Sequence, residues 1–133
     1  MPTAAAADLV GVPLFETLEP EDQTAIAPWF DVQDVSSGVK LTGEGAPGYS
    51  FFVLLEGTAT VTINGIEVRT LQPGDFFGEL AILGEGRRTA TVTTTSPAKV
   101  LVLFGTEFRQ LQQEYPELAA QIESQLRAAS QAA

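Results

Sequence analysis

Residues 31 to 104 carry the pattern that most restricts the fold, because apolar and polar side chains alternate there in short segments separated by turn residues. Alternation with a period of two is typical of β-strands that bury one face. In the clearest case, Ala59, Val61 and Ile63 alternate with threonines and lead to Asn64-Gly65, the strongest short-range hairpin signal. We therefore predict a mainly β fold, a small antiparallel jelly-roll barrel (double-stranded β-helix) of about eight short strands.

Helical patterns flank the predicted barrel on both sides. Before it, we expect a mobile tail over residues 1–8, a short helical segment over residues 9–18, and a helix that begins at Pro20. After it, one amphipathic helix ends near Pro116 and a second carries an apolar stripe, Leu118, Ile122 and Leu126. The expected domain is residues 9–133, with helices at about 9–30, the β-roll at about 31–104 and C-terminal helices at about 106–130.

Composition excludes several classes of function. The 133 residues include no cysteine and no histidine, which argues against a zinc, copper or non-haem iron centre and against nucleophiles that need a histidine base. The net charge of −10, with only seven scattered basic residues, argues against a nucleic-acid partner. Neither a signal peptide nor a membrane-spanning stretch is present in the sequence. We expect a soluble, cytoplasmic protein that is not an enzyme, has no cofactor and does not insert into membranes.

One segment, Phe76-Phe77-Gly78-Glu79-Leu80-Ala81-Ile82-Leu83 followed by Arg88-Thr89-Ala90-Thr91-Val92, has the chemistry of a binding site. A glycine lets backbone approach a ligand closely, and the free N–H groups of a helix that starts after it attract an anion. Arg88 can pair with a phosphate, and Glu79 beside it needs a partner of its own, such as a sugar hydroxyl. An ordinary Glu79–Arg88 surface ion pair is the alternative interpretation, which the surrounding motif makes less favoured.

This segment resembles the phosphate-binding cassette of cyclic-nucleotide-binding domains. That family includes the regulatory subunits of cAMP-dependent protein kinase, cyclic-nucleotide-regulated channels and the bacterial catabolite activator protein. Residues 77–83 and 88–92 fit the family pattern nearly position for position. Upstream, Gly43-Glu44-Gly45, residues 52–57 and Pro73-Gly74-Asp75 extend the resemblance, which covers about residues 10 to 127.

The resemblance implies a role for each matching residue. Glu79 would accept the ribose 2′-hydroxyl, Arg88 would pair with the cyclic phosphate, and Thr89 would hydrogen-bond that phosphate. Val61 and Leu71 match positions that line the base and sugar. Arg69 departs from the apolar residue that channels of the family often carry, and lies either at the pocket mouth or in solvent. The implied ligand-binding residues are Gly78, Glu79, Leu80, Ala81, Arg88, Thr89, Val61 and Leu71.

The predicted function is a non-catalytic sensor of a cyclic mononucleotide, cAMP rather than cGMP, that signals by repositioning its C-terminal helix. The alternative is a domain of this shape that binds no nucleotide and serves as a docking or dimerisation module. The apolar stripe faces the barrel, a bound ligand as a lid, or a twin chain, and Gln121, Gln125 and Arg127 are the polar side chains placed to contact a base. A homodimer and an unidentified effector both remain open as partners, as does whether the chain is free-standing or a module of a larger protein.

Overall fold

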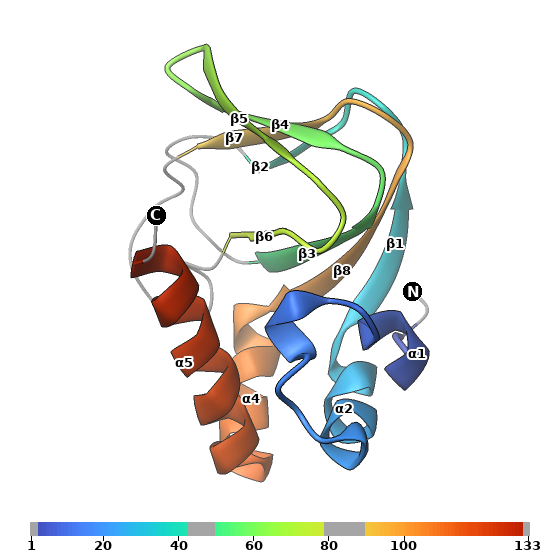
Figure 1. Ribbon diagram of the computed structural model, residues 1–133, viewed down its shortest axis with the longest axis vertical. Coiled ribbons are helices and arrows are strands. Elements are labelled where there is room, and N and C mark those ends of the chain that lie inside the picture. The colour runs from blue at the N-terminus through green and yellow to red at the C-terminus, as the bar shows by residue number, and fades with distance from the viewer. Residues whose placement is uncertain (1–2, 43–49, 79–89, 132–133) are drawn as a thin grey trace.

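The computed structural model describes residues 3–42, 50–78 and 90–131 and arranges them as two antiparallel sheets with helices on one side (Figure 1). The first sheet has the strand order β1-β8-β3-β6 and the second has the order β2-β7-β4-β5. The strands are β1 (Asp31–Val35), β2 (Lys40–Thr42), β3 (Ser50–Glu56), β4 (Ala59–Ile63), β5 (Ile66–Leu71), β6 (Phe76–Phe77), β7 (Thr91–Thr94) and β8 (Ala98–Phe104). The predicted fold class, a jelly-roll of short antiparallel strands with flanking helices, is confirmed.

The two central strands of the first sheet, β3 and β8, are buried on both faces. Along β3, Phe51 and Val53 belong to a core shared with the helices, while Phe52 and Leu54 belong to a second core that faces the other sheet. The same division holds along β8, where Leu101 faces the helical side and Val100 the roll interior. Since both faces need apolar residues, these two strands read as continuous hydrophobic runs rather than as alternating ones.

Helices cover the first sheet from both ends of the chain. They are α1 (Ala6–Leu9), α2 (Pro20–Ile26), α4 (Gly105–Glu114) and α5 (Pro116–Gln131), with 3₁₀ turns η1 (Pro13–Phe15) and η2 (Ala27–Trp29). Pro20 occupies the first turn of α2, as predicted, where its missing N–H costs no hydrogen bond. Their shared core includes a T-shaped Phe15–Phe30 pair with ring centroids 5.5 Å apart. In Figure 1 this helical layer lies beneath the roll.

The N-terminal segment differs from the prediction. Residues 3–8 are not a mobile tail: Thr3 bridges to Asp31, and the Ala4 N–H donates to the Phe30 carbonyl over 2.9 Å. Of the short helical segment expected over residues 9–18, the structure has the end of α1 at Leu9 and the 3₁₀ turn η1, and no further α-helix. Gly11, with φ of 84°, and Pro13 explain the break, since neither the left-handed backbone nor the missing N–H continues an α-helix.

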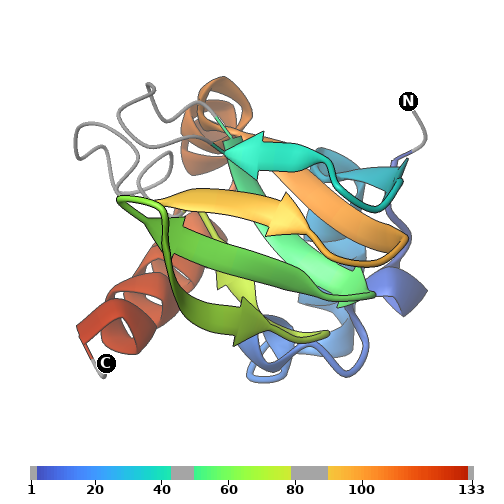
Figure 2. The same cartoon turned by 90° about the horizontal axis from the view of Figure 1, so that it is seen from above.

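The hairpin between β4 and β5 is as predicted. Asn64 and Gly65 have φ of 53° and 76°, which is the backbone that a tight two-residue hairpin turn needs. Ile63 and Ile66 pair directly across its end. Seen from above in Figure 2, the four strands of the second sheet lie side by side, with β5 at one edge.

Candidate functional site

In the second sheet, residues paired across neighbouring strands form rows, and the side chains of one row face the same side of the sheet. Ala59 is opposite both Leu71 of β5 and Thr94 of β7, and all three are buried. Two residues along, Val61 is opposite both Arg69 and Val92. Because alternate residues of a strand face the same side, this second row also faces inward. We call these two rows, Thr94–Ala59–Leu71 and Val92–Val61–Arg69, the inner rows.

The inner rows bring two predicted site residues together. Leu71 is 1 % exposed and Val61 is half-buried, and both pack in the core between the sheets. The outer rows of the same strands carry mainly threonines, for example Thr60 and Thr62, which are half-buried. The sheet therefore offers an apolar surface to the roll interior and a polar one to the outside. Whether Val61 and Leu71 contact a ligand remains a prediction.

Arg69 is the residue whose place the sequence left open, and the register puts it in an inner row opposite Val61. Its Nη2 atom lies 4.0 Å from Oδ2 of Asp75, and the two side chains are 58 % and 40 % exposed. In the sequence, Arg69 stood out only as a departure from the family pattern, either at the pocket mouth or in solvent. The signal that identifies its orientation is its two-residue offset from the buried Leu71 on the same strand.

Asp75 is held rigidly just before the glycine motif. Its Oδ2 atom accepts from the Gln72 N–H over 2.8 Å, and its carbonyl accepts from the Leu54 N–H over 2.9 Å. The Gly74 N–H in turn donates to the Leu54 carbonyl over 2.7 Å. The turn that carries Asp75 is thus fixed to β3, and the position of the carboxylate is set by backbone hydrogen bonds.

Gly78 ends the described part of the motif. It follows β6, where Phe77 stacks on Phe52 with ring centroids 4.9 Å apart and an interplanar angle of 11°. Gly78 has φ of 78°, a backbone that other residues adopt only with strain. The packed Phe77 therefore anchors the strand, and the backbone at the next position favours a residue without a Cβ.

The remaining predicted site residues, Glu79, Leu80, Ala81, Arg88 and Thr89, lie outside the described residues. The chain leaves the first sheet at Gly78 and enters the second sheet at Thr91, where β7 begins. Next to that entry, the Thr42 hydroxyl donates to the Ala90 carbonyl over 3.2 Å. The cassette sequence therefore connects the two sheets that enclose the roll interior.

The C-terminal stripe lies in a core that the helices share with the first sheet of the roll. Leu118, Ile122 and Leu126 are 6 %, 1 % and 0 % exposed and belong to the core of the helical layer. That core includes Phe15 of η1 and Phe108 of α4. The same core contains Phe51 and Leu101 of the first sheet, so the predicted barrel side is part of it and the N-terminal segment is an additional partner.

The polar residues expected to contact a base have different neighbours in the structure. Gln121 lines a surface depression of about 360 Å³ with Asp22 and Tyr115, beside the junction of α4 and α5. The Gln125 amide donates to the Thr17 hydroxyl over 3.5 Å, and Arg127 pairs with Glu123 over 3.4 Å. Whether any of the three contacts a base stays a prediction.

The described residues contain neither a membrane-spanning helix nor a cluster of metal ligands. Within residues 3–42, 50–78 and 90–131, no helix is long and apolar enough to cross a membrane. Over the same ranges, no three acidic side chains gather in a way that could hold a metal ion.

Comparison with known proteins identifies the family. The model of the cyclic nucleotide-binding domain matches residues 32–115, so the chain belongs to this family. A cAMP-dependent protein kinase regulatory subunit from Colletotrichum orbiculare is 38 % identical over 102 residues, which are 75 % of this chain and 26 % of that protein. The chain thus spans about a quarter of the length of the curated relatives it matches.

Two solved structures share the fold. The regulatory domain of Toxoplasma gondii PKA, crystallised with cAMP, has a TM-score of 0.82 at 24 % identity and covers 96 % of this chain and 49 % of that one. The regulatory subunit of a cAMP-independent protein kinase A from Trypanosoma brucei has a TM-score of 0.81 at 20 % identity, covering 94 % and 44 %. At these identities the likeness extends to the fold alone.

Proposed function

We propose that this chain is a non-catalytic sensor that binds a cyclic mononucleotide inside the roll, cAMP ahead of cGMP. The observation that carries the proposal is the cassette sequence, which lies within the family match and connects the two sheets. The cAMP-dependent kinase regulatory subunits among its relatives support cAMP as the first ligand to test and support a regulatory rather than a catalytic role.

The binding roles follow from the chemistry of the motif. Gly78, with its positive φ, allows the backbone to turn toward a ligand, and the N–H groups near Leu80 and Ala81 donate to the phosphate. Arg88 neutralises that phosphate by a charge-assisted hydrogen bond, and Thr89 adds a neutral one. Glu79 accepts from the ribose 2′-hydroxyl, while Val61 and Leu71 of the inner rows contact the base and sugar.

The output of the sensor is a shift in the position of the C-terminal helices. Because α5 buries its stripe against η1 and α4, any movement of α5 must also change the packing of the N-terminal segment. A ligand can change this equilibrium only through a difference in its affinity for the two arrangements. The N-terminal segment therefore moves together with α5 rather than acting as a fixed base.

A domain of this shape that binds no nucleotide, and serves as a docking or dimerisation module, is the second candidate function. The likeness of the fold to the regulatory subunit of a cAMP-independent kinase favours keeping it, because this fold occurs in a protein with that description. The two candidates differ in one property, the affinity for cyclic nucleotides.

An equilibrium titration by calorimetry with cAMP, cGMP and linear 5′-AMP separates the two. The sensor should bind both cyclic nucleotides and should bind 5′-AMP more weakly, since the linear phosphate lacks the cyclic geometry that the cassette fits. Glu79→Gln should weaken binding of cAMP, and 2′-deoxy-cAMP should lose little further on that variant. No heat of binding with either cyclic nucleotide would favour the docking module.

A further inference from the structure

A depression of about 360 Å³ lies where α2 meets the junction of α4 and α5, at the end of the helical layer away from the roll (Figure 1). Its apolar lining comes from Ala25, Pro116 and Leu118, and Tyr115 beside them is 43 % exposed. Exposed aromatic rings are enriched where proteins contact a partner. We call this depression the junction groove. It is separate from the proposed nucleotide site, which lies inside the roll.

The polar lining of the junction groove is mainly negative. Three carboxylates, Asp22, Glu114 and Glu117, line it together with Gln121. Of the described residues that line the groove, none is basic. Within the part of the chain that the structure describes, none of the three carboxylates takes part in an ion pair or a side-chain hydrogen bond. The groove therefore combines an apolar surface with carboxylates that are open to a partner.

Helix-end electrostatics explain two of these carboxylates but not the third. Asp22 lies in the first turn of α2 and Glu117 in the first turn of α5, where the helix dipole favours a negative charge. Glu114 is the last residue of α4, where the same dipole disfavours a negative charge. An exposed carboxylate at this helix end, beside two others in one groove, lowers the stability of the unbound chain. A cation bound in the groove would offset that loss.

The groove favours an organic cation over a metal ion. Over the described ranges, no three acidic side chains gather in a way that could hold a metal ion, so the carboxylates do not form a chelating set. A guanidinium is flat, pairs with carboxylates by two parallel hydrogen bonds and stacks on aromatic rings. The methylene stem of an arginine suits the apolar lining. A second copy of this chain is disfavoured as the occupant, because it carries the same net charge of −10.

We propose that the junction groove is a docking site for a basic, arginine-bearing segment of a partner protein. The arginine side chain stacks on Tyr115 and pairs with Glu114 and Glu117 at the edge of the apolar lining. Asp22 adds a negative charge from α2, so that the partner contacts helices from both ends of the chain. This inference goes beyond the proposed function and does not depend on nucleotide binding.

The test is an NMR titration of the full-length, ¹⁵N-labelled chain, without nucleotide and at about 0.15 M salt, where long-range attraction is screened. The probes are a capped Gly-Arg-Gly-Arg-Gly peptide and the same peptide with citrulline, which keeps the shape of arginine without its charge. The proteins are the wild type, Glu114→Gln/Glu117→Gln, Tyr115→Leu and a matched control, Asp34→Asn/Glu67→Gln. The control removes the same two charges from exposed positions of β1 and β5.

The arginine peptide should bind the wild type saturably and shift the amide signals of residues 22–25 and 114–121. Glu114→Gln/Glu117→Gln should weaken this binding by about 5- to 30-fold, and Tyr115→Leu by about 2- to 5-fold. The control should change it less than about twofold. All of the substituted positions are exposed, so thermal unfolding should show that every variant keeps its fold.

Equal weakening in the control and in Glu114→Gln/Glu117→Gln would overturn the proposal, because it would mean a general attraction to an acidic protein. Equal binding of the citrulline peptide, an unchanged affinity in Tyr115→Leu, or a wild type without saturable binding would also overturn it. None of these results bears on the proposed function, since no nucleotide takes part in the titration.

Discussion

The two sheets of the roll bury very different amounts of their surface. In the first sheet, Leu101 and Leu103 of β8 are fully buried against the helices, and Val100 and Val102 are buried against the other sheet. In the second sheet, residues 66–70 of β5 are exposed and only Leu71 at its end is buried. Most of the hydrophobic stabilisation must therefore come from the first sheet and its helices. The second sheet buries less apolar surface, so substitutions along β5 should affect stability less.

The largest expected effect tests this difference directly. Leu101→Ala removes a fully buried side chain of β8 and should lower the free energy of unfolding by about 2–5 kcal/mol, because a cavity remains. Ile66→Ala, at a position 67 % exposed in β5, should change it by less than about 0.5 kcal/mol. Urea unfolding of both variants gives the comparison. Similar losses would mean that the two sheets share the stability equally.

Two glycines at turns test whether the tightly packed junction of the two sheets is more sensitive to substitution than the exposed hairpin of the second sheet. Gly57 joins β3 of the first sheet to β4 of the second, with φ of 90°, and an added Cβ would overlap the Pro97 carbonyl oxygen. Gly65, at the outer hairpin, has φ of 76° and nothing within 4 Å of such a Cβ. Both alanine variants suffer backbone strain of about 1–2 kcal/mol.

Gly57→Ala should cost roughly 1–3 kcal/mol more than Gly65→Ala, because its methyl group is also overpacked. Differential scanning calorimetry on the pair measures the excess. Equal melting temperatures would show that the junction between the sheets accommodates an added methyl group as well as the hairpin turn does.

Adjacent threonines of β7 provide a smaller effect. Thr94 is 1 % exposed; its hydroxyl donates to the Ser36 carbonyl over 2.7 Å and accepts from the Val39 N–H over 2.9 Å. Thr94→Val leaves those two backbone groups without partners and should cost about 1–3 kcal/mol. Thr93→Val, on the outer row, should lie within about 0.5 kcal/mol of the wild type. Chemical denaturation measures both, and a comparable loss at Thr93 would remove the distinction between inner and outer rows.

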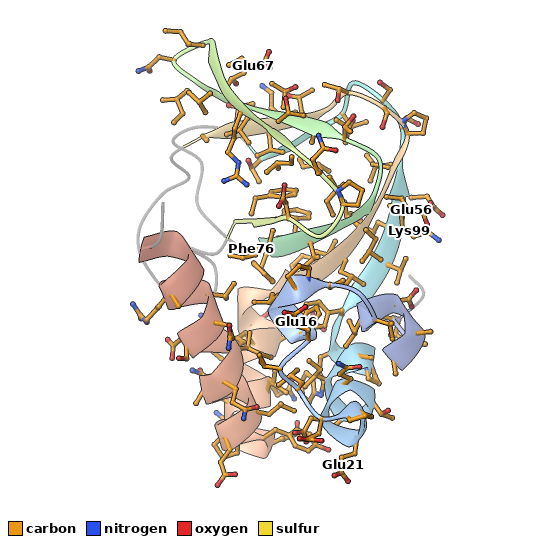
Figure 3. The ribbon with its side chains drawn as sticks, in the orientation of Figure 1. Glu16, Glu21, Glu56, Glu67, Phe76 and Lys99 are labelled. Carbon is orange, nitrogen blue, oxygen red and sulfur yellow. The ribbon has the colours of Figure 1, made fainter. Side chains whose placement is uncertain are left out.

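The smallest effect is expected at the rim of the first sheet. Figure 3 shows Glu56 and Lys99 close together where β3 ends and β8 begins, and Lys99 Nζ lies 3.5 Å from Glu56 Oε2, with side chains 35 % and 69 % exposed. Glu56→Gln should reduce stability by less than about 1 kcal/mol, because exposed pairs are screened by solvent. The difference should shrink further in 1 M salt. A larger decrease in melting temperature that does not depend on salt would mean that this pair contributes substantially to stability.

Features fixed by local chemistry could be predicted from the sequence. The Asn64-Gly65 hairpin follows from the positive φ that only such residues adopt easily, and Pro20 marks the start of α2 for a comparable reason. Features fixed by distant contacts could not. The bridge from Thr3 to Asp31 and the contact of Gln125 with Thr17 join segments that no local pattern connects.

Within the site, Val61 and Leu71 face the same side of the sheet because of a bulge on β5. The sequence pattern did not predict this bulge, since unbroken alternation from the Ile63–Ile66 pair would place Val61 opposite Val68. The register passes from Val61–Arg69 to Thr62–Glu67, so Val68 is an extra residue, and Glu67 falls opposite an outer-row threonine rather than beside Arg69. Figure 3 shows Glu67 at the outer end of the hairpin, away from the roll interior. In a β5 without the bulge, Glu67 would lie on the same face as Arg69 and Leu71, next to the Arg69 side chain.

The most direct test of the central claim is the affinity of Arg88→Ala for cAMP beside that of Arg87→Ala. The two variants lose the same charge at neighbouring positions, and only Arg88 occupies the motif position that resembles the family's phosphate-binding arginine. Removing that charge-assisted contact should weaken binding by about 1.5–3 kcal/mol, or roughly 10- to 150-fold, while Arg87→Ala should change it by less than about threefold. The account predicts this separation in calorimetric titrations of two folded variants. Equal affinities in Arg88→Ala and the wild type would contradict it.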